Sequence, residues 1–191
     1  MLPFLFLWLM GSFVFFDAFR SFSQSEKLAY TVTEIMSRHD AVDDTDIDYL
    51  RSLQLNMNVT RSANSWLRIS SICYLDGQYK VLWSTTRADP GMSVQPLEDE
   101  VIPTDIMPLL VNHDTIILAE MGGRWSPLSK NVGAAPQDFV NRLAVRPRYV
   151  KAIPHVNLNL AILCPSNEVD TPVTAVAAAA STAGTLVARG Q

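Results

Sequence analysis

The pattern of apolar positions predicts one long helix at the start of the chain, from Leu2 to about His39, with Pro3 tolerated in its first turn. Its first section, residues 1–16, contains no charged side chain. This run falls just short of the about 20 residues that cross the hydrocarbon layer of a bilayer. We expect a membrane anchor, with a buried core helix as the alternative, because aromatic residues point around the whole helix circumference and so suit lipid better than a one-sided core: Phe4, Phe6, Trp8, Phe13, Phe15 and Phe16.

Beyond the anchor, the same helix carries one apolar stripe at steps of three, four or seven: Phe15, Phe19, Phe22, Ala29, Val32 and Met36. We expect this stripe to cover the sheet of the following domain, and a surface for a partner protein is the alternative. Asp17 lies one helical turn from Arg20. A carboxylate at the end of an apolar helix either marks the water boundary or faces an interface.

A second, shorter helix is predicted to run to about Leu55. Asp44 or Thr45 is suited to cap its first turn, because both side chains accept hydrogen bonds from free backbone N–H groups. We interpret the acidic cluster at this start as a helix terminus and not as a calcium loop, because the central Gly and the closing Glu of such a loop are missing. The cluster favours the positive end of the helix dipole and contains Asp43, Asp44, Asp46 and Asp48.

The clearest local pattern is a β-hairpin over residues 66–84, in which Asp76-Gly77 joins two β-rich runs. One face is expected to lie against the helix, and loops or a neighbouring protein must cover the other. A two-residue loop predicts three cross-strand pairs on one face: Tyr74 with Tyr79, Ile72 with Val81 and Ser70 with Trp83. The other face would then hold Leu67, Ile69, Cys73, Leu75 and Leu82.

Three further strands are predicted over residues 113–122, 139–150 and 157–164, and Thr104 is predicted to begin a short helical turn through Leu110. Gly122-Gly123 reads as a turn after the first of these strands. Two helices followed by strands predict an α+β fold with a mainly antiparallel sheet. We expect an anchor and amphipathic helix over residues 1–39, an extracytoplasmic α+β domain over 40–165, and a flexible low-complexity tail over 166–191.

Charge and cysteine content narrow the classes of function. The net charge is −4 and no basic run exceeds two residues, so we expect no nucleic-acid partner. Cys73 and Cys164 either form one disulfide, which closes a loop of 91 residues, or stay reduced in the core. The compartment decides between the two, because disulfides persist outside the cytoplasm.

Catalytic chemistry has no recognisable signature in this sequence. The GxSxG, HExxH, phosphate-loop, dinucleotide-binding and paired CxxC patterns do not occur. We interpret His39, His113 and His155 as solvated or capping residues. A hydrolase built on His113 and Asp114 would require a Ser or Cys to converge with them. We expect no enzyme activity, no cofactor, no metal and no small-molecule substrate.

The first twenty residues resemble the anchor of a known family. The stretch from Phe4 to Arg20 ends Phe-Val-Phe-Phe-Asp-Ala-Phe-Arg, and it is similar to the hydrophobic helix of TadE-like proteins, the pseudopilins of the tight-adherence (Flp) pilus system. Residues 75–83, 115–120, 125–128 and 143–149 resemble further blocks of that family in the same order. The resemblance spans about residues 4–165.

The resemblance implies a pilin-like fold and a structural function. The chain would be a membrane-anchored pseudopilin or minor pilin, single-pass in the bacterial inner membrane, with its domain in the periplasm or in the surface pilus. Its partners would be membrane lipid, other pilin or pseudopilin subunits and the pilus assembly machinery. The helix residues expected to pack or anchor are Trp8, Phe15, Asp17, Phe19 and Phe22.

Two features depart from the family pattern. Family members are cut after a Gly that has a Glu at the fifth position beyond it, whereas Gly11 is followed by Asp17 at the sixth. Arg20, Lys27 and Arg38 all follow the apolar run, and a positive-inside count places the domain in the cytoplasm. A basic leader upstream of Met1 would account for both. The alternative function is an anchored periplasmic ligand-binding or sensor domain, which requires a concave pocket.

Overall fold

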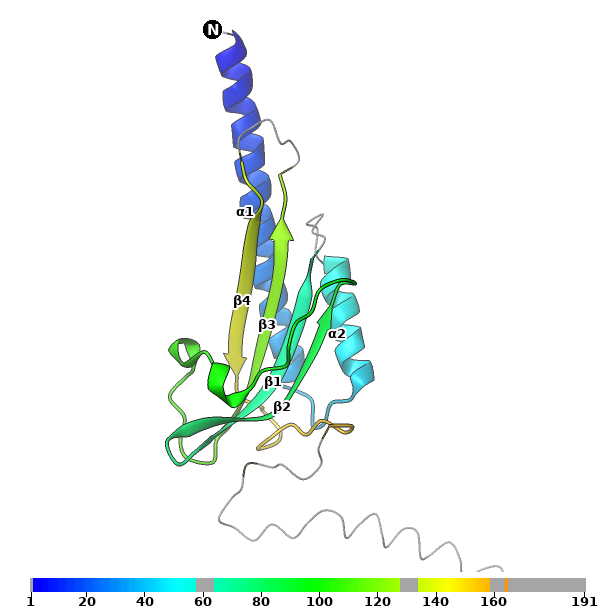
Figure 1. The fold of residues 1–191 in the computed structure, drawn as a ribbon, viewed down its shortest axis with the longest axis vertical. Helices are drawn as coiled ribbons and strands as arrows, with labels where there is room; N and C mark the ends of the chain where they lie inside the picture. The colour runs from blue at the N-terminus through cyan, green and yellow to red at the C-terminus, as the bar shows by residue number, and fades with distance from the viewer. Residues whose placement is uncertain (1, 58–63, 128–133, 159–163, 165–191) are drawn as a thin grey trace, which may run out of the picture.

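The computed structural model describes residues 2–57, 64–127, 134–158 and 164. They form a long helix, a short helix and one four-stranded sheet, which confirms the predicted α+β fold (Figure 1). The helices are α1 (Leu2–Met36) and α2 (Asp44–Met57), and the strands are β1 (Trp66–Leu75), β2 (Gln78–Ala88), β3 (Thr115–Trp125) and β4 (Gln137–Val145). Single 3-10 turns at Asp99–Val101 and Thr104–Ile106 lie between β2 and β3, and the second is shorter than the helical turn predicted through Leu110.

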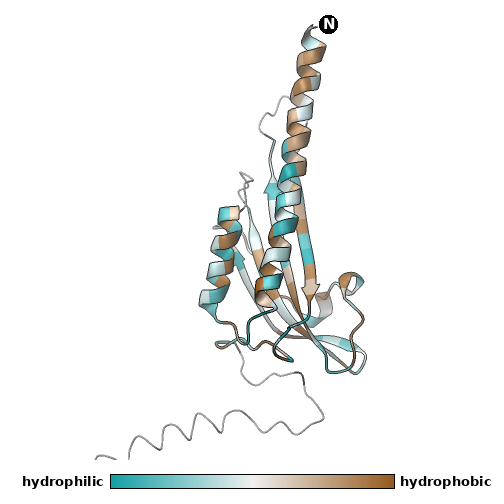
Figure 2. Ribbon diagram, turned by 180° about the vertical axis from the view of Figure 1, so that it is seen from behind, coloured by the Kyte–Doolittle hydropathy of each residue, from teal (hydrophilic) through white to brown (hydrophobic). Residues whose placement is uncertain are grey.

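The sheet has the strand order β2-β1-β3-β4, and each neighbouring pair is antiparallel. Both helices lie on one face of it, and the connection between β2 and β3 crosses the other face (Figures 1 and 2). The lower part of α1 lies along β3 and β4, whereas its N-terminal part extends past the end of the sheet. The molecule is therefore a layered domain with a helical extension.

The main core lies between the helices and the sheet. Val32 and Met36 of α1 and Ile47 of α2 are fully buried against Ile69 and Ile117 of the central strands. A smaller core on the opposite face contains Ile72, Leu97, Ile116 and Leu118. Because successive side chains of a strand point to opposite faces, β3 contributes to both cores and is buried over nearly its whole length. Each large apolar side chain buried in this way contributes about 1.5–3 kcal/mol.

The apolar stripe predicted on α1 is only partly in contact with the sheet. Ala29, Val32 and Met36 are buried as expected, but Phe15, Phe19 and Phe22 are exposed. The buried face turns instead through the small residues Ser21 and Ser25 and begins at Val14. The prediction that the whole stripe covers the sheet was wrong, because the sheet approaches the upper part of the helix on its small polar side.

The ends of the two helices also differ from the sequence prediction. The α-helix α1 ends at Met36 and not at His39, because the N–H groups of Arg38 and His39 turn back to the carbonyls of Ile35 and Met36 in i to i−3 bonds of 3.1 and 3.2 Å. At the start of α2, Asp43 is the cap and not Asp44 or Thr45. The Asp46 N–H donates to Asp43 Oδ1 at 2.9 Å, and the Asp43 N–H donates to Asp46 Oδ2 at 3.1 Å. This reciprocal pair is a capping box.

The hairpin forms as predicted near its turn and shifts register farther away. Tyr74 pairs with Tyr79 and Ile72 with Val81, but a bulge then places Ser70 opposite Ser84 and Ser71 opposite Trp83. The predicted pair of Ser70 with Trp83 is therefore wrong. The extra residue in β2 turns Trp83 to the helix side, where it joins Leu82 in the main core.

Gly122 and Gly123 lie inside β3 and do not form the predicted turn. A Cβ on Gly122 would lie 2.1 Å from the indole of Trp66, and a Cβ on Gly123 would lie 2.9 Å from the ring of Phe139. Trp66 on β1 is the cross-strand neighbour of Gly122, and Phe139 on β4 is that of Gly123, so each ring lies against the backbone of a glycine in β3. Glycine is required here for close approach of aromatic rings.

The predicted fourth strand ends at Val145, five residues early, before Pro147, which lacks the N–H that a strand would use. The chain then returns to the helices, where the Arg148 N–H donates to the carbonyl of Ser37 at 2.9 Å. Of the predicted fifth strand, Asn157 and Leu158 form a turn, Cys164 is placed outside a strand, and residues 159–163 lie outside the described residues. The predicted tail, 166–191, also lies outside them.

Candidate functional site

The N-terminal part of α1 exposes a continuous apolar surface. Phe4, Trp8 and Phe15 are 79%, 74% and 74% exposed, and other large apolar side chains between them, such as Phe6 and Phe13, are each 64% exposed. Figure 2 shows the apolar character of this part of the helix. Over Pro3–Met36 the helix is long and apolar enough to cross a membrane, and 11% of its most apolar stretch is buried in the structure. An exposed apolar patch of this kind is typical of a surface that meets lipid or another protein.

Asp17 joins this surface to the domain. Its Oδ2 accepts a hydrogen bond of 3.0 Å from the indole N–H of Trp125, the last residue of β3. The Trp125 side chain is buried, whereas Asp17 is exposed. Asp17 was singled out from the sequence, but its partner was not, because 108 residues separate them.

Small side chains hold α1 close to the sheet one and two turns below Asp17. Ser21 and Ser25 are buried, and the Asn141 side-chain amide on β4 donates to Ser25 Oγ at 2.7 Å. Ser25 Oγ also donates to the carbonyl of Phe22 at 2.8 Å. The helix is therefore held by polar contacts to the sheet at the level where Phe19 and Phe22 remain exposed.

The aromatic residues Phe15, Phe19 and Phe22 follow one another at spacings of four and three, so they form one stripe on α1. The stripe lies next to the buried face of α1 that begins at Val14, so its side chains do not pack against the sheet. We call these three residues the aromatic stripe. It is open to contact with a second helix.

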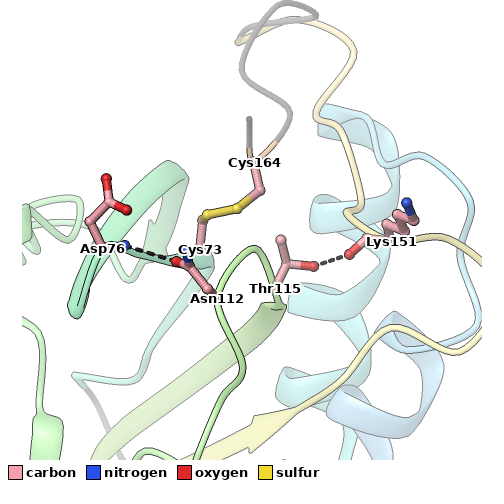
Figure 3. The surroundings of a disulfide bond; sticks show 6 residues. All are labelled: Cys73, Asp76, Asn112, Thr115, Lys151 and Cys164. Atoms are coloured by element: carbon pink, nitrogen blue, oxygen red, sulfur yellow. Dashed lines mark hydrogen bonds between the residues drawn. A yellow bond between two sulfur atoms is a disulfide. The ribbon is translucent and has the colours of Figure 1, made fainter. Parts of the chain in front are cut away.

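The two cysteines form a disulfide between β1 and the C-terminal segment (Figure 3). The Cα atoms of Cys73 and Cys164 are 5.7 Å apart, within the usual range for such a bond, and both residues are buried. Closing this 91-residue separation stabilises the fold by about 4–5 kcal/mol in the chain-entropy model. Of the two alternatives left open by the sequence, the structure contains the oxidised one.

A buried carboxylate on the outer face of the sheet was not found from the sequence. Glu120 is fully buried and lies between Arg68, at 2.5 Å, and Arg142, at 3.0 Å. The three residues are direct neighbours across β1, β3 and β4. The three residues come together only through the pairing register of the strands, since no local sequence pattern connects their positions. Each guanidinium offsets the cost of burying the carboxylate.

The three histidines lie in different surroundings in the structure. His155 is fully buried beside Trp83, with ring centroids 5.3 Å apart, so the interpretation of it as a solvated or capping residue was wrong. His39 does cap the end of α1, with its Nδ1 2.9 Å from the carbonyl of Ile35. The Asp114 carboxylate lies 3.2 Å from Arg146 and accepts a hydrogen bond from the Val111 N–H, so its partners among the described residues do not include the His113 side chain.

No family model, curated protein or solved structure matches the chain. Among the described residues, no cluster of His, Cys, Asp or Glu is able to hold a metal ion. The features that bear on function are the exposed apolar half of α1 and the contacts that fix this helix to the domain.

Proposed function

We propose that this protein is a membrane-anchored, pseudopilin-like or minor-pilin-like structural subunit that acts in the assembly of a bacterial pilus of the Tad/Flp type. The observation that carries the proposal is the division of α1 into two parts. One part exposes large apolar side chains around its circumference, and the other is covered by β3 and β4.

Lipid accounts for the first part of the helix. Leaving Phe4, Trp8 and Phe13 in water forgoes about 1.5–3 kcal/mol for each side chain, relative to burial. The backbone groups of a helix are satisfied internally, so the bilayer accepts this segment without further partners. The exposed apolar segment supports a single-pass membrane anchor, which we propose lies in the bacterial inner membrane.

Helix packing between subunits accounts for the aromatic stripe. Phe19 and Phe22 lie beyond Asp17, beside the polar contacts of Ser21 and Ser25, and are 63% and 50% exposed. The helix of another pilin-like subunit would cover them, in the i, i+3 and i+4 pattern that helices use to pack. The pilus assembly machinery is the second expected partner.

The disulfide supports a domain outside the cytoplasm, in the periplasm or in the pilus. Cys73–Cys164 is expected to persist only in an oxidising compartment. The basic residues Arg20 and Lys27 favour the opposite orientation. We give the disulfide more weight, because the charge rule is a statistical bias, whereas the thiols of the cytoplasm would keep Cys73 and Cys164 reduced in each molecule.

Photo-crosslinking in cells tests the proposed role. A photoreactive residue in place of Phe19 is expected to crosslink to other pilin-like or pilus assembly subunits, and detergent pull-down is expected to recover the same proteins. Tyr49 on α2, 64% exposed, is the matched control and is expected to give no such crosslink. Recovery of the membrane-anchored protein without any pilus or secretion component would contradict the proposal.

A further inference from the structure

The contact between α1 and the sheet extends into the uncharged section of the helix. Val14 is 9% exposed, whereas its neighbours Phe13 and Phe15 are 64% and 74% exposed. Asp17, the first charged residue of the chain, follows Val14 by about one helical turn. The domain therefore covers one side of α1 at a level that the proposed anchor places at the edge of the bilayer.

The end of the β3–β4 pair is the part of the domain that reaches this level. Asn141 on β4 contacts Ser25, and Trp125 at the end of β3 contacts Asp17. From Ser25 to Asp17 the helix rises by about 12 Å, at about 1.5 Å per residue. From Asn141 to Gln137, the partner of Trp125, β4 rises by about 14 Å, at about 3.4 Å per residue. The helix and the two strands therefore keep pace along their contact (Figure 1).

The chain continues past both strand ends toward the N-terminus of α1. Ser126 and Pro127 follow β3, residues 134–136 precede β4, and both segments lie beside α1 (Figures 1 and 2). Two extended residues span about 7 Å, which exceeds the about 4.5 Å of helix between Asp17 and Val14. The two segments therefore reach at least the level of Val14. We call residues 126–127 and 134–136 the sheet tip.

The composition of the sheet tip suits the headgroup layer of a membrane. Its residues carry no charge, and Ser126, Ala135 and Pro136 are exposed. Pro127 and Pro136 have no backbone N–H, so two donors that would otherwise need a partner are absent. The hydrocarbon core still excludes this segment, because irregular backbone leaves polar groups unsatisfied there. The headgroup layer, where water remains, accepts it.

Charged residues reappear where the strands begin. Arg124 and Asp138 are paired across β3 and β4 at 3.6 Å, and their side chains are 48% and 75% exposed. These opposite charges balance, so they give the surface no preference for anionic lipid. We propose that the sheet tip is a second membrane-contact site, which lies among the lipid headgroups of the leaflet from which α1 leaves the bilayer. This inference rests on the membrane anchor of the proposed function, but not on a role in a pilus.

The experiment uses the full chain in phosphatidylcholine liposomes, with one introduced cysteine that carries an environment-sensitive fluorophore. Cys73 and Cys164 are joined, so the introduced thiol is the one that is labelled. Two quenchers are compared, a lipid with a nitroxide on its headgroup and a lipid with a nitroxide near the end of an acyl chain. The label at Ala135→Cys is expected to lose more emission with the headgroup nitroxide than with the deep one.

Three further positions complete the test. Ser126→Cys is expected to behave like Ala135→Cys, so the test does not depend on one variant. Phe6→Cys on the anchor is expected to show the opposite order, with the deep nitroxide quenching more. Gln78→Cys is the matched control, because this exposed residue follows the β1–β2 turn at the far end of the sheet, and we expect it to be quenched by neither lipid (Figure 1).

The outcomes separate this inference from the anchor on which it rests. Quenching at Phe6→Cys without quenching at Ala135→Cys and Ser126→Cys would overturn the sheet tip as a contact site and leave the anchor standing. Stronger quenching of the tip labels by the deep nitroxide would also overturn the headgroup placement. No quenching at any of the three positions would overturn the anchor and the inference together.

Discussion

Trp125 at the end of β3 donates its indole N–H to the carboxylate of Asp17 on α1, at 3.0 Å. This bond joins the end of the sheet to the helix where the exposed apolar part of α1 meets the covered part. At the other end of the contact, the Arg148 N–H donates to the carbonyl of Ser37. The helix is thus tied to the domain at both ends of their shared surface.

Trp125→Phe is expected to lower the free energy of unfolding by about 1.5–3 kcal/mol, because it removes a hydrogen bond to a charged group and keeps a ring in place. Urea unfolding in detergent micelles measures the change. Tyr30→Phe is the matched control, since Tyr30 is 58% exposed and its hydroxyl makes no hydrogen bond to the described residues. Equal stability of the two variants would show that the bond contributes nothing.

Gly122→Ala is expected to destabilise the sheet by about 1–3 kcal/mol, because the new Cβ would lie 2.1 Å from the Trp66 ring. The substitution Gly11→Ala, where no atom lies within 4 Å, is the control and is expected to cause no loss of stability. The double variant Gly122→Ala with Trp66→Ala relieves the clash. If Gly122→Ala loses the same stability with and without Trp66, the ring is not the cause.

The stability of the domain is expected to fall in acid through Asp89. Burial alone raises the pKa of its carboxyl, but hydrogen bonds from Ser65 and the charge of Arg51 outweigh burial and hold the pKa below its ordinary value. The unfolded chain therefore binds a proton first, at about pH 4, and stability falls as the pH drops from there through the folded pKa.

Asp89→Asn removes this titration, so its free energy of unfolding is expected to depend less steeply on pH below about pH 4. At neutral pH the variant is expected to be the less stable, because Arg51, which lies 2.5 Å from Asp89, then loses its charged partner. Urea unfolding across the acid range measures both effects. An unchanged acid slope would contradict the assignment to Asp89.

Replacing both cysteines, Cys73→Ser with Cys164→Ser, is expected to lower the free energy of unfolding by about 4–5 kcal/mol. Dithiothreitol is expected to destabilise the wild type by a similar amount and to leave the double variant unchanged. Free thiols in protein isolated from its native compartment under non-reducing conditions would show that the disulfide does not form there.

The features that could be predicted from the sequence are those that short stretches of the chain determine by themselves. The α+β class, the hairpin turn at Asp76-Gly77 and the two helices follow from periodicity and turn chemistry within short windows. Aromatic exposure at Trp8 and Phe15 also follows, since a helix that is apolar all round cannot bury every side chain against one sheet.

The remaining features depend on contacts between distant segments. The bulge that turns Trp83 inward lets its indole donate to the carbonyl of Ile153 at 2.7 Å, a partner 70 residues away. The burial of Glu120 requires arginines on two other strands. Gly122 and Gly123 read as a turn because the aromatic rings that cover them come from β1 and β4. No window of sequence contains these partners.

The most direct test of the central claim is the depth of Trp8 in a bilayer. Emission from Trp8 is obtained as the difference between wild type and Trp8→Phe in liposomes that contain lipids brominated in their acyl chains. We predict that bromine quenches this emission strongly and that the protein stays with the liposomes under alkaline carbonate. Unquenched Trp8 emission, with the protein recovered from the aqueous phase, would contradict a lipid-embedded α1.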